Sequence, residues 1–217
     1  MSLVRVHNFA VSLDGFGTGE GQSLDAPFGH AGQRLHEWFV GTQAFQDIIG
    51  SGQSGTLGVD HALAAQFGPG IGAEIMGRGK YFPESRAWTH EEWRGWWGDN
   101  PPFHTPVFVL TDNELPPLEM EGGTTFHFVN ASPDEALELA REAADGLDVR
   151  IGGGPTTVRE FLEADLVDFM HVTVVPIVLG RGVRLWDNLE DLDQRFDIDT
   201  VASPSGVVHY MFQRKPR

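Results

Sequence analysis

Residues 150–162 read RIGGGPTTVREFL, and this stretch decides the fold. An apolar run leads into three glycines that end a strand, and a helix-like sequence with a proline in its first turn follows. A strand that ends in glycines and feeds a helix is the repeating unit of open α/β sheets. The helix N-terminus then lies at the carboxyl edge of the sheet, where such sheets bind ligands.

The glycine loop has two interpretations. Gly152, Gly153 and Gly154 carry no Cβ, so the backbone can approach a ligand closely. Thr156 and Thr157 add hydroxyl donors, and a helix N-terminus favours an anion by a few tenths to about 1 kcal/mol. The alternative is a turn that only needs positive φ. Because the spacing matches neither G-x-G-x-x-G nor the P-loop, both interpretations stay open on this stretch alone.

Outward from the loop, strand-like and helix-like segments alternate. Apolar runs predict strands at 4–13, 73–77, 106–111, 124–130, 148–154, 168–180 and 206–215. Amphipathic or capped segments predict helices at 33–45, 61–68, 133–146 and 155–166, the second capped by Asp60 and the third opened by a capping box of Ser132 and Glu135. We therefore expect one domain over residues 1–217, a three-layer α/β fold with a mainly parallel central sheet and antiparallel C-terminal strands.

Composition excludes several classes of site. The chain has no cysteine, so it has no disulfide, zinc–thiolate site or cysteine nucleophile. Its nine histidines show no metal-ligand spacing, so we expect no metal. The start of the chain lacks a secretory signal, and no apolar run is long enough to span a bilayer. These features favour a cytoplasmic protein.

The formal net charge of −16 bears on the choice of partner. Such a surface repels phosphate backbones and anionic lipids, so neither nucleic acid nor membrane is expected as a partner. A bound anion would need local help from backbone N–H groups at a helix N-terminus and from a few placed cations. The position of each cation is therefore informative.

Two further predicted strand ends carry chemistry that suits phosphate. Arg78 and Lys80 follow the strand at 73–77, although a solvated turn with a basic pair is the alternative. Thr111 and Asp112 end the strand at 106–111, where a plain strand end is the alternative. Since parallel strands end at the same edge of a sheet, the three strand ends together fit one extended ligand, a dinucleotide.

These features resemble the dihydrofolate reductase-like superfamily. The stretches NFAVSLDGF, IMGRGKYF, PVFVLTD and residues 149–187 are most similar to the branch that contains the riboflavin-biosynthesis reductase domain, the C-terminal half of the bifunctional deaminase-reductase. The resemblance implies NADPH as cofactor and hydride transfer to a small planar heterocycle or a carbonyl or imine compound, similar to 5-amino-6-(5-phosphoribosylamino)uracil reductase. It also implies a small-molecule substrate, of riboflavin-precursor or pterin-like class, and a homodimer.

The resemblance also implies the site residues. The nicotinamide would lie near Ala10, Val11, Asp14 and Gly15; phosphates would meet Gly77, Arg78, Gly79 and Lys80; the adenosine end would meet Leu110 and Thr111; and the pyrophosphate would lie on Gly152, Gly153, Gly154, Pro155, Thr156 and Thr157. Asp14 is the catalytic candidate, at a strand end before a flexible loop. Its alternative role is a turn aspartate that stabilises the Asp-Gly step.

Three departures limit the resemblance. Lys80 stands where the family's G-R-x-T motif has threonine, so it either replaces a phosphate contact or reads the adenosine 2′-phosphate. Leu35 stands where dihydrofolate reductase has its pterin-binding carboxylate, so dihydrofolate is not the expected substrate. The deaminase half, with its H-x-E and P-C-x-x-C motifs, is absent.

Some alternatives remain at the level of sequence. A non-catalytic dinucleotide-binding module, acting as a sensor or interaction protein, would keep the glycine loop but would not need Asp14. His36 and Glu37 are weaker catalytic candidates that a solvent-facing helix would also explain. The tryptophans at 88–97 stack on a heterocycle or pack a surface loop, and packing is favoured. His171 is expected to be a satisfied residue of the sheet.

Overall fold

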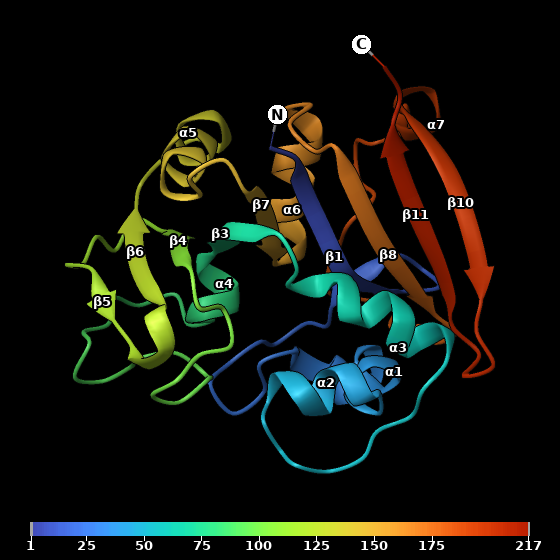
Figure 1. Ribbon diagram of the computed structural model, residues 1–217, viewed down its shortest axis with the longest axis horizontal. Coiled ribbons are helices and arrows are strands. Elements are labelled where there is room, and N and C mark those ends of the chain that lie inside the picture. The colour runs from blue at the N-terminus through green and yellow to red at the C-terminus, as the bar shows by residue number, and fades with distance from the viewer. Residues whose placement is uncertain (1, 217) are drawn as a thin grey trace.

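A single nine-stranded sheet forms the centre of the computed structural model, which describes residues 2–216 (Figure 1). Its strands, in spatial order, are β10 (Phe196–Ala202), β11 (Val208–Arg214), β8 (Phe169–Val175), β1 (Val4–Ser12), β7 (Asp148–Gly153), β3 (Ile71–Gly77), β4 (Pro106–Leu110), β6 (Thr125–Val129) and β5 (Leu118–Glu119). The six strands from β8 to β6 are parallel, and β10, β11 and β5 add antiparallel edges. A small ribbon pairs β2 (Phe16–Thr18) with β9 (Val183–Arg184).

Helices cover both faces of the sheet, which gives the three expected layers. The first group is α5 (Pro133–Ala143) and α6 (Pro155–Glu163); the second is η1 (Gly29–Leu35), α1 (Glu37–Val40), α2 (Gln43–Ile48), α3 (Val59–Ala64) and η2 (Ala65–Phe67). Short turns of helix elsewhere are α4 (Arg78–Tyr81), η3 (Glu121–Gly123) and α7 (Leu192–Arg195). Between residues 2 and 216, no helix has the length and apolar character that crossing a membrane requires.

Side chains along each strand point alternately to the two faces of the sheet, so each group of helices covers a separate hydrophobic core. Val11 of β1 and Ile75 of β3 pack with Phe161 in the cluster under α5 and α6. Ala10 of β1 instead packs with Leu35 in the cluster under η1 and α1. Neighbouring residues of one strand point to opposite faces, so β1 contributes to both cores. The predicted α/β fold class, with its antiparallel C-terminal strands, is confirmed.

Local signals explain where the helices begin. Ser132 and Glu135 form the predicted capping box at the start of α5. Gly154 is the N-cap of α6, and Pro155 occupies the first turn, where its missing N–H costs nothing. Phe161 and Leu162 on the inner face of α6 are fully buried, so tertiary packing holds the helix on the sheet.

Several predicted boundaries were wrong for identifiable reasons. The expected helix at 33–45 is split, because Thr42 is extended and its side chain accepts the N–H of Phe45 to start α2 anew. The N-cap of α3 is Gly58 rather than Asp60, which lies in the first turn. Strand β8 ends at Val175 because Pro176 cannot donate to a ladder. Strand β10 was not predicted, because most of its residues are exposed and polar residues interrupt the apolar ones.

The order of the strands creates a topological switch point in the sheet. Strands β1 and β7 are parallel neighbours, but the segment after β1 leads to the face of α1–α3 and the segment after β7 leads to the face of α6. Diverging connections leave an opening at the carboxyl ends of two such strands, which is where open α/β sheets bind ligands. The glycine loop that follows β7 lies at this point.

Candidate functional site

The three glycines of the loop have three different environments. A Cβ on Gly152 would collide with the carboxylate of Glu74 and lie 2.9 Å from Lys80 Nζ. Gly153 has φ near 110°, a conformation that favours glycine, and its peptide bond to Gly154 is cis. A Cβ on Gly154 would meet no atom within 4 Å among the described residues beyond its chain neighbours. The loop is therefore open at Gly154, the N-cap of α6.

The end of β3 lies against the first turn of α6. A Cβ on Gly77 would collide with the hydroxyl of Thr157 and lie 3.9 Å from the carbonyl oxygen of Gly153. Thr157 is buried, so its hydroxyl faces the end of β3. The structure thus brings together two predicted phosphate-binding stretches that are far apart in sequence, at residues 77 and 157.

The turn after β1 completes the same edge. A Cβ on Gly17 would lie 3.0 Å from the ring of Phe9 and 3.1 Å from Cβ of Pro155. Ala10 and Val11 are both buried, so only their backbone can face a ligand at this edge. Gly15 has φ of 85° and packs under Trp186.

The carboxylate of Asp14 holds a turn. It accepts hydrogen bonds from the Ser12 hydroxyl at 2.6 Å and from the amides of Leu179 and Gly180 at 3.1 and 2.7 Å. Although burial opposes the shift, these hydrogen bonds lower the pKa of Asp14 to about 2. A carboxylate with this pKa does not donate a proton at neutral pH, so the contacts favour the turn-aspartate role over the catalytic one.

The two predicted phosphate-binding cations are already engaged. Lys80 Nζ donates to Glu74 Oε1 at 3.1 Å and to the carbonyl oxygen of Gly152 at 2.9 Å. Arg78 Nη2 donates to the carbonyl oxygens of Glu84 and Arg86 at 2.6 and 2.5 Å. Arg78 Nε is buried and has no hydrogen-bond partner among residues 2–216. Gly79 is open, with no atom near a Cβ built on it within the described chain.

The end of β4 lies beside the end of β3. Leu110 pairs with Gly77 in the ladder, and Thr111 is buried. The Thr111 hydroxyl accepts the N–H of Asn113 at 3.0 Å, so it stabilises the turn that leaves the strand. The backbone of this turn lies next to Gly77, and the predicted adenosine contacts are thus at the same edge as the glycine loop.

The tryptophans pack a loop. Trp88 is 1% exposed, and Trp93 and Trp96 donate their ring N–H groups to the carbonyl oxygens of Tyr81 and Lys80 at 2.8 and 2.9 Å. These contacts fasten the loop over α4. The packed-loop interpretation of this segment therefore accounts for the described contacts.

His36 is more enclosed than the sequence indicated. Its ring lies 4.2 Å from that of Phe28, and its Nδ1 is buried without a hydrogen-bond partner in the part of the chain that the structure describes. Burial, and then the charge of Lys80, lower the pKa of His36 to about 4, so the ring is neutral at pH 7. Glu37 is exposed, as a solvent-facing helix residue would be.

One buried ion pair near the loop was missed in the sequence. Glu74 of β3 and Arg150 of β7 are adjacent in the sheet, 0% and 3% exposed, and Arg150 Nε donates to Glu74 Oε2 at 2.8 Å. Arg150 Nη1 donates to the carbonyl oxygen of Phe67 at 2.7 Å, and the guanidinium lies over the Phe67 ring. The sequence signal that could have revealed this ion pair is the presence of one charged residue inside each of two apolar strands.

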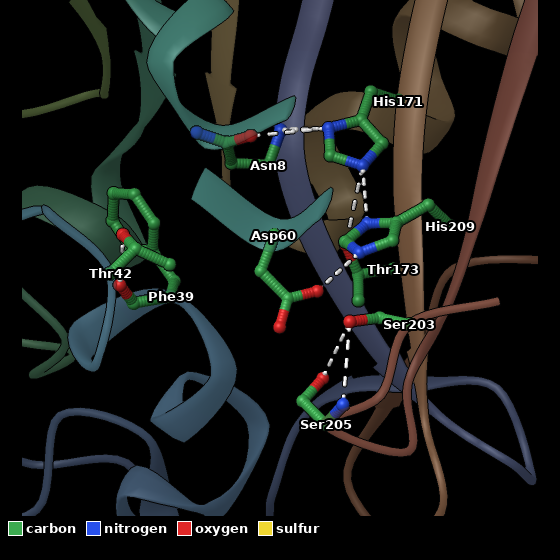
Figure 2. Close-up of polar contacts among 9 residues, drawn as sticks. All are labelled: Asn8, Phe39, Thr42, Asp60, His171, Thr173, Ser203, Ser205 and His209. Carbon is green, nitrogen blue, oxygen red and sulfur yellow. Dashed lines mark hydrogen bonds and ion pairs between the residues drawn. The ribbon is translucent and has the colours of Figure 1, made fainter. Parts of the chain in front are cut away.

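A second buried cluster lies on the same face of the sheet, beneath α1 and α3 (Figure 2). Asp60 accepts from His209 Nε2 at 2.8 Å, His209 Nδ1 lies 2.9 Å from His171 Nε2, and His171 Nδ1 lies 3.4 Å from the backbone N–H of Asn8. Burial, and then the neighbouring His209, lower the pKa of His171 to about 3. His171 is therefore a satisfied residue of the sheet, as predicted, although its partners were not foreseen.

No set of three or more histidine, aspartate or glutamate side chains within residues 2–216 is arranged to hold a metal ion. The described site instead offers backbone amides, glycine surface and one helix N-terminus. Together they define an α/β protein with an open helix N-terminus and a glycine loop at the switch point of its sheet.

The RibD C-terminal domain model matches residues 5–203, and the chain belongs to this family. The resemblance to the riboflavin-biosynthesis reductase branch is thereby confirmed. YwjB, an uncharacterized protein of Bacillus subtilis (strain 168), is 29% identical over 99 residues, a segment that covers 39% of this chain and 51% of YwjB. The matched segment thus spans about half the length of that curated relative.

Solved structures share the fold at low identity. A pyrimidine reductase-like protein from Corynebacterium diphtheriae NCTC has a TM-score of 0.53 at 14% identity, over 100% of this chain and 92% of that one. The diaminohydroxyphosphoribosylaminopyrimidine deaminase/5-amino-6-(5-phosphoribosylamino)uracil reductase of Thermotoga maritima has a TM-score of 0.54 at 13% identity, over 99% of this chain and 57% of that one.

Proposed function

We propose that this chain is an NADPH-dependent reductase that transfers a hydride to a small planar heterocycle or a carbonyl or imine compound of riboflavin-precursor or pterin-like class. Membership of the RibD C-terminal domain family supports the reductase class. The observation that carries the proposal is the open N-terminus of α6 at Gly154, beside the switch point between β1 and β7.

The residues present fit a dinucleotide. The amides at the start of α6, which have no side-chain cap, and the open backbone at Gly154 suit a pyrophosphate. The buried, unpartnered Nε of Arg78 supplies a further donor near the end of β3. The backbone at Leu110 and Thr111 extends the same edge toward the adenosine end.

Bound NADPH supplies the hydride, and the protein supplies position and electrostatics. In this proposal the amides of the glycine loop hold the pyrophosphate, and the buried backbone at Ala10 and Val11 borders the nicotinamide. Asp14 keeps the 179–180 turn in place beside that end of the site. Leu35 is fully buried, and the ring of His36 next to it is neutral.

Titration with NADPH and, separately, NADH tests the proposal through quenching of the six tryptophans. Saturable binding of NADPH, tighter than that of NADH, is expected, and turnover with a heterocycle from the proposed class should follow. If neither cofactor binds, the glycine loop is only a turn and the reductase proposal fails. Tight binding without turnover on any such substrate would favour a non-catalytic binding module.

A homodimer is part of the same proposal. Light scattering at working concentration is expected to give twice the mass of 23.9 kDa. A monomer under those conditions would contradict it.

A further inference from the structure

Lys80 lies at the junction of three parts of the candidate site. It belongs to α4, directly after β3, and its Nζ bonds both to Glu74 in β3 and to the carbonyl oxygen of Gly152 near the end of β7. The two loops that the sequence assigned to phosphate are therefore joined through one ammonium group. A lysine aimed outward at a phosphate would not make either contact.

The two oxygens of Glu74 are divided between two cations. Oε2 accepts from Arg150, and Oε1 accepts from Lys80. Glu74 is fully buried, and although burial opposes ionisation, the charges of Arg150 and Lys80 lower its pKa. One carboxylate with two cations leaves a net charge of +1 beneath the glycine loop, in a chain whose total is −16.

The same network explains the first glycine of the loop. A Cβ on Gly152 would collide with Glu74 Oε1, so this glycine is required by the buried carboxylate and not by a ligand. Gly154, two residues later, is the position open to a ligand. Gly152 thus allows the loop to pack on the buried carboxylate, and Gly154 leaves the loop accessible to a ligand.

We propose that Lys80 is a positioning residue for the anion site: it fixes the Gly152 carbonyl and holds the positive charge of the Glu74–Lys80–Arg150 network under the glycine loop, and thereby sets the affinity for a pyrophosphate group at the N-terminus of α6. The proposal rests on the function proposed above and gives Lys80 a role other than direct phosphate contact.

The test compares three variants of the full-length protein without ligand and with NADPH or inorganic pyrophosphate. Lys80→Met removes the ammonium, and Lys80→Arg keeps the charge. Lys215→Met is the matched control, because it removes the same charge at the far end of the chain, where Nζ bonds the Asp193 carbonyl oxygen. The chain has no other lysine.

Hydrogen exchange of the amides at 152–158 in the ligand-free protein is the decisive readout, since a direct phosphate ligand would not affect it. Lys80→Met is expected to speed this exchange and to weaken NADPH and pyrophosphate binding by about tenfold, a factor that corresponds to about 1.4 kcal/mol. Lys80→Arg and Lys215→Met should stay close to the wild type. If Lys80→Met does not fold, Lys80→Gln takes its place.

Other outcomes overturn the proposal. Weaker binding with unchanged exchange would make Lys80 a direct ligand, and unchanged binding would remove its role in the site. If the wild-type protein binds neither NADPH nor pyrophosphate, the proposed function fails. In that case faster exchange in Lys80→Met would still show that Lys80 positions the loop, and unchanged exchange would refute that as well.

Discussion

Two buried polar clusters occupy the same face of the sheet and differ in chemistry. The first joins Glu74, Arg150 and Lys80 beneath the glycine loop. The second joins Asp60, His209 and His171 beneath α1 and α3 (Figure 2). Glu74 stays ionised because two cations surround it, whereas His171 stays neutral because burial and His209 lower its pKa to about 3.

The difference shows that one face of the sheet can hold an ion pair that includes arginine and, separately, a histidine cluster whose protonation depends on pH. Arg150 is charged at every accessible pH and so keeps Glu74 ionised, whereas burial lowers the pKa of Lys80, the third member of the first cluster. Imidazoles exchange protons near neutral pH, so the second cluster contributes a stability that depends on pH. The loop that we propose binds a cofactor contacts the first cluster, through the bond from Lys80 to the carbonyl oxygen of Gly152.

The largest expected effect comes from breaking the first cluster. Glu74→Gln leaves the buried Arg150 without its carboxylate, and loss of one partner from a buried ion pair typically costs about 3–5 kcal/mol. Denaturant unfolding at pH 7.5 measures it. The double variant Glu74→Leu with Arg150→Met should recover part of the loss, because a well-packed apolar pair removes the unpaired guanidinium, while Lys80 keeps only its bond to the Gly152 carbonyl oxygen. Equal losses in the single and double variants would contradict this explanation.

The second cluster predicts a loss of stability in acid. His171 has a folded-state pKa of about 3 and an ordinary value of 6.5, so its contribution is complete above pH 6.5 and is lost as pH falls toward 3. In that window the free energy of unfolding should fall by about 1.4 kcal/mol per pH unit for this group. His7 and His36, also lowered by burial, add to the slope with the same sign.

The variant His171→Gln should reduce that slope, whereas Glu74→Gln should leave it unchanged between pH 5 and 7. Denaturant unfolding at pH 7.5, 6.0 and 5.0 measures both slopes. His171 contacts His209, Thr173 and Asn8, and all three remain in the variant. Asp60, which accepts from His209, and His7, whose pKa is lowered in part by His171, also remain. An identical slope in wild type and His171→Gln would show that His171 does not cause the pH dependence of the free energy of unfolding.

Alanine substitutions at two glycines of the loop should distinguish an effect on stability from an effect on ligand binding. Gly152→Ala introduces a collision with Glu74, and overpacking of this kind costs about 1–3 kcal/mol of stability. Gly154→Ala meets open space, so its effect on stability should stay below about 1 kcal/mol, while the new methyl group obstructs the ligand. Thermal unfolding and NADPH titration of both variants provide the comparison. Equal loss of stability in the two would contradict it.

The smallest expected effect belongs to Asp14→Asn. An amide keeps one oxygen acceptor for the 179–180 amides but loses the charge, so NADPH affinity should change by less than about threefold while exchange of those two amides becomes faster. Hydrogen exchange together with turnover is the measurement. Complete loss of turnover with unchanged exchange would restore the catalytic role that the sequence indicated.

Features with a local signal could be predicted from the sequence. The capping box at Ser132, the proline after Gly154 and the apolar run at 106–111 each determine structure within a few residues, and all three elements were found. The glycine loop and its position at the carboxyl edge followed from the same kind of signal. Spacing along one strand and its turn is sufficient for such predictions.

Features that depend on distant neighbours could not be predicted. Glu74 and Arg150 are 76 residues apart, and His171 and His209 are 38 apart, so their pairing requires the strand order itself. Lys80 was placed correctly at a strand end, but spacing does not give the direction of a flexible side chain. Asp14 shows the same limit, because an Asp-Gly turn has one sequence pattern for two roles.

The pairing of Glu74 with Arg150 also bears on how the sheet assembles. Strand β7 arrives late in the chain and has to insert between β1 and β3, both already synthesised. Shifting β7 by one residue would bury Arg150 among the apolar side chains under α5 and α6 and leave Glu74 alone on the other face. The ion pair thus specifies both the position of β7 between β1 and β3 and its register against β3.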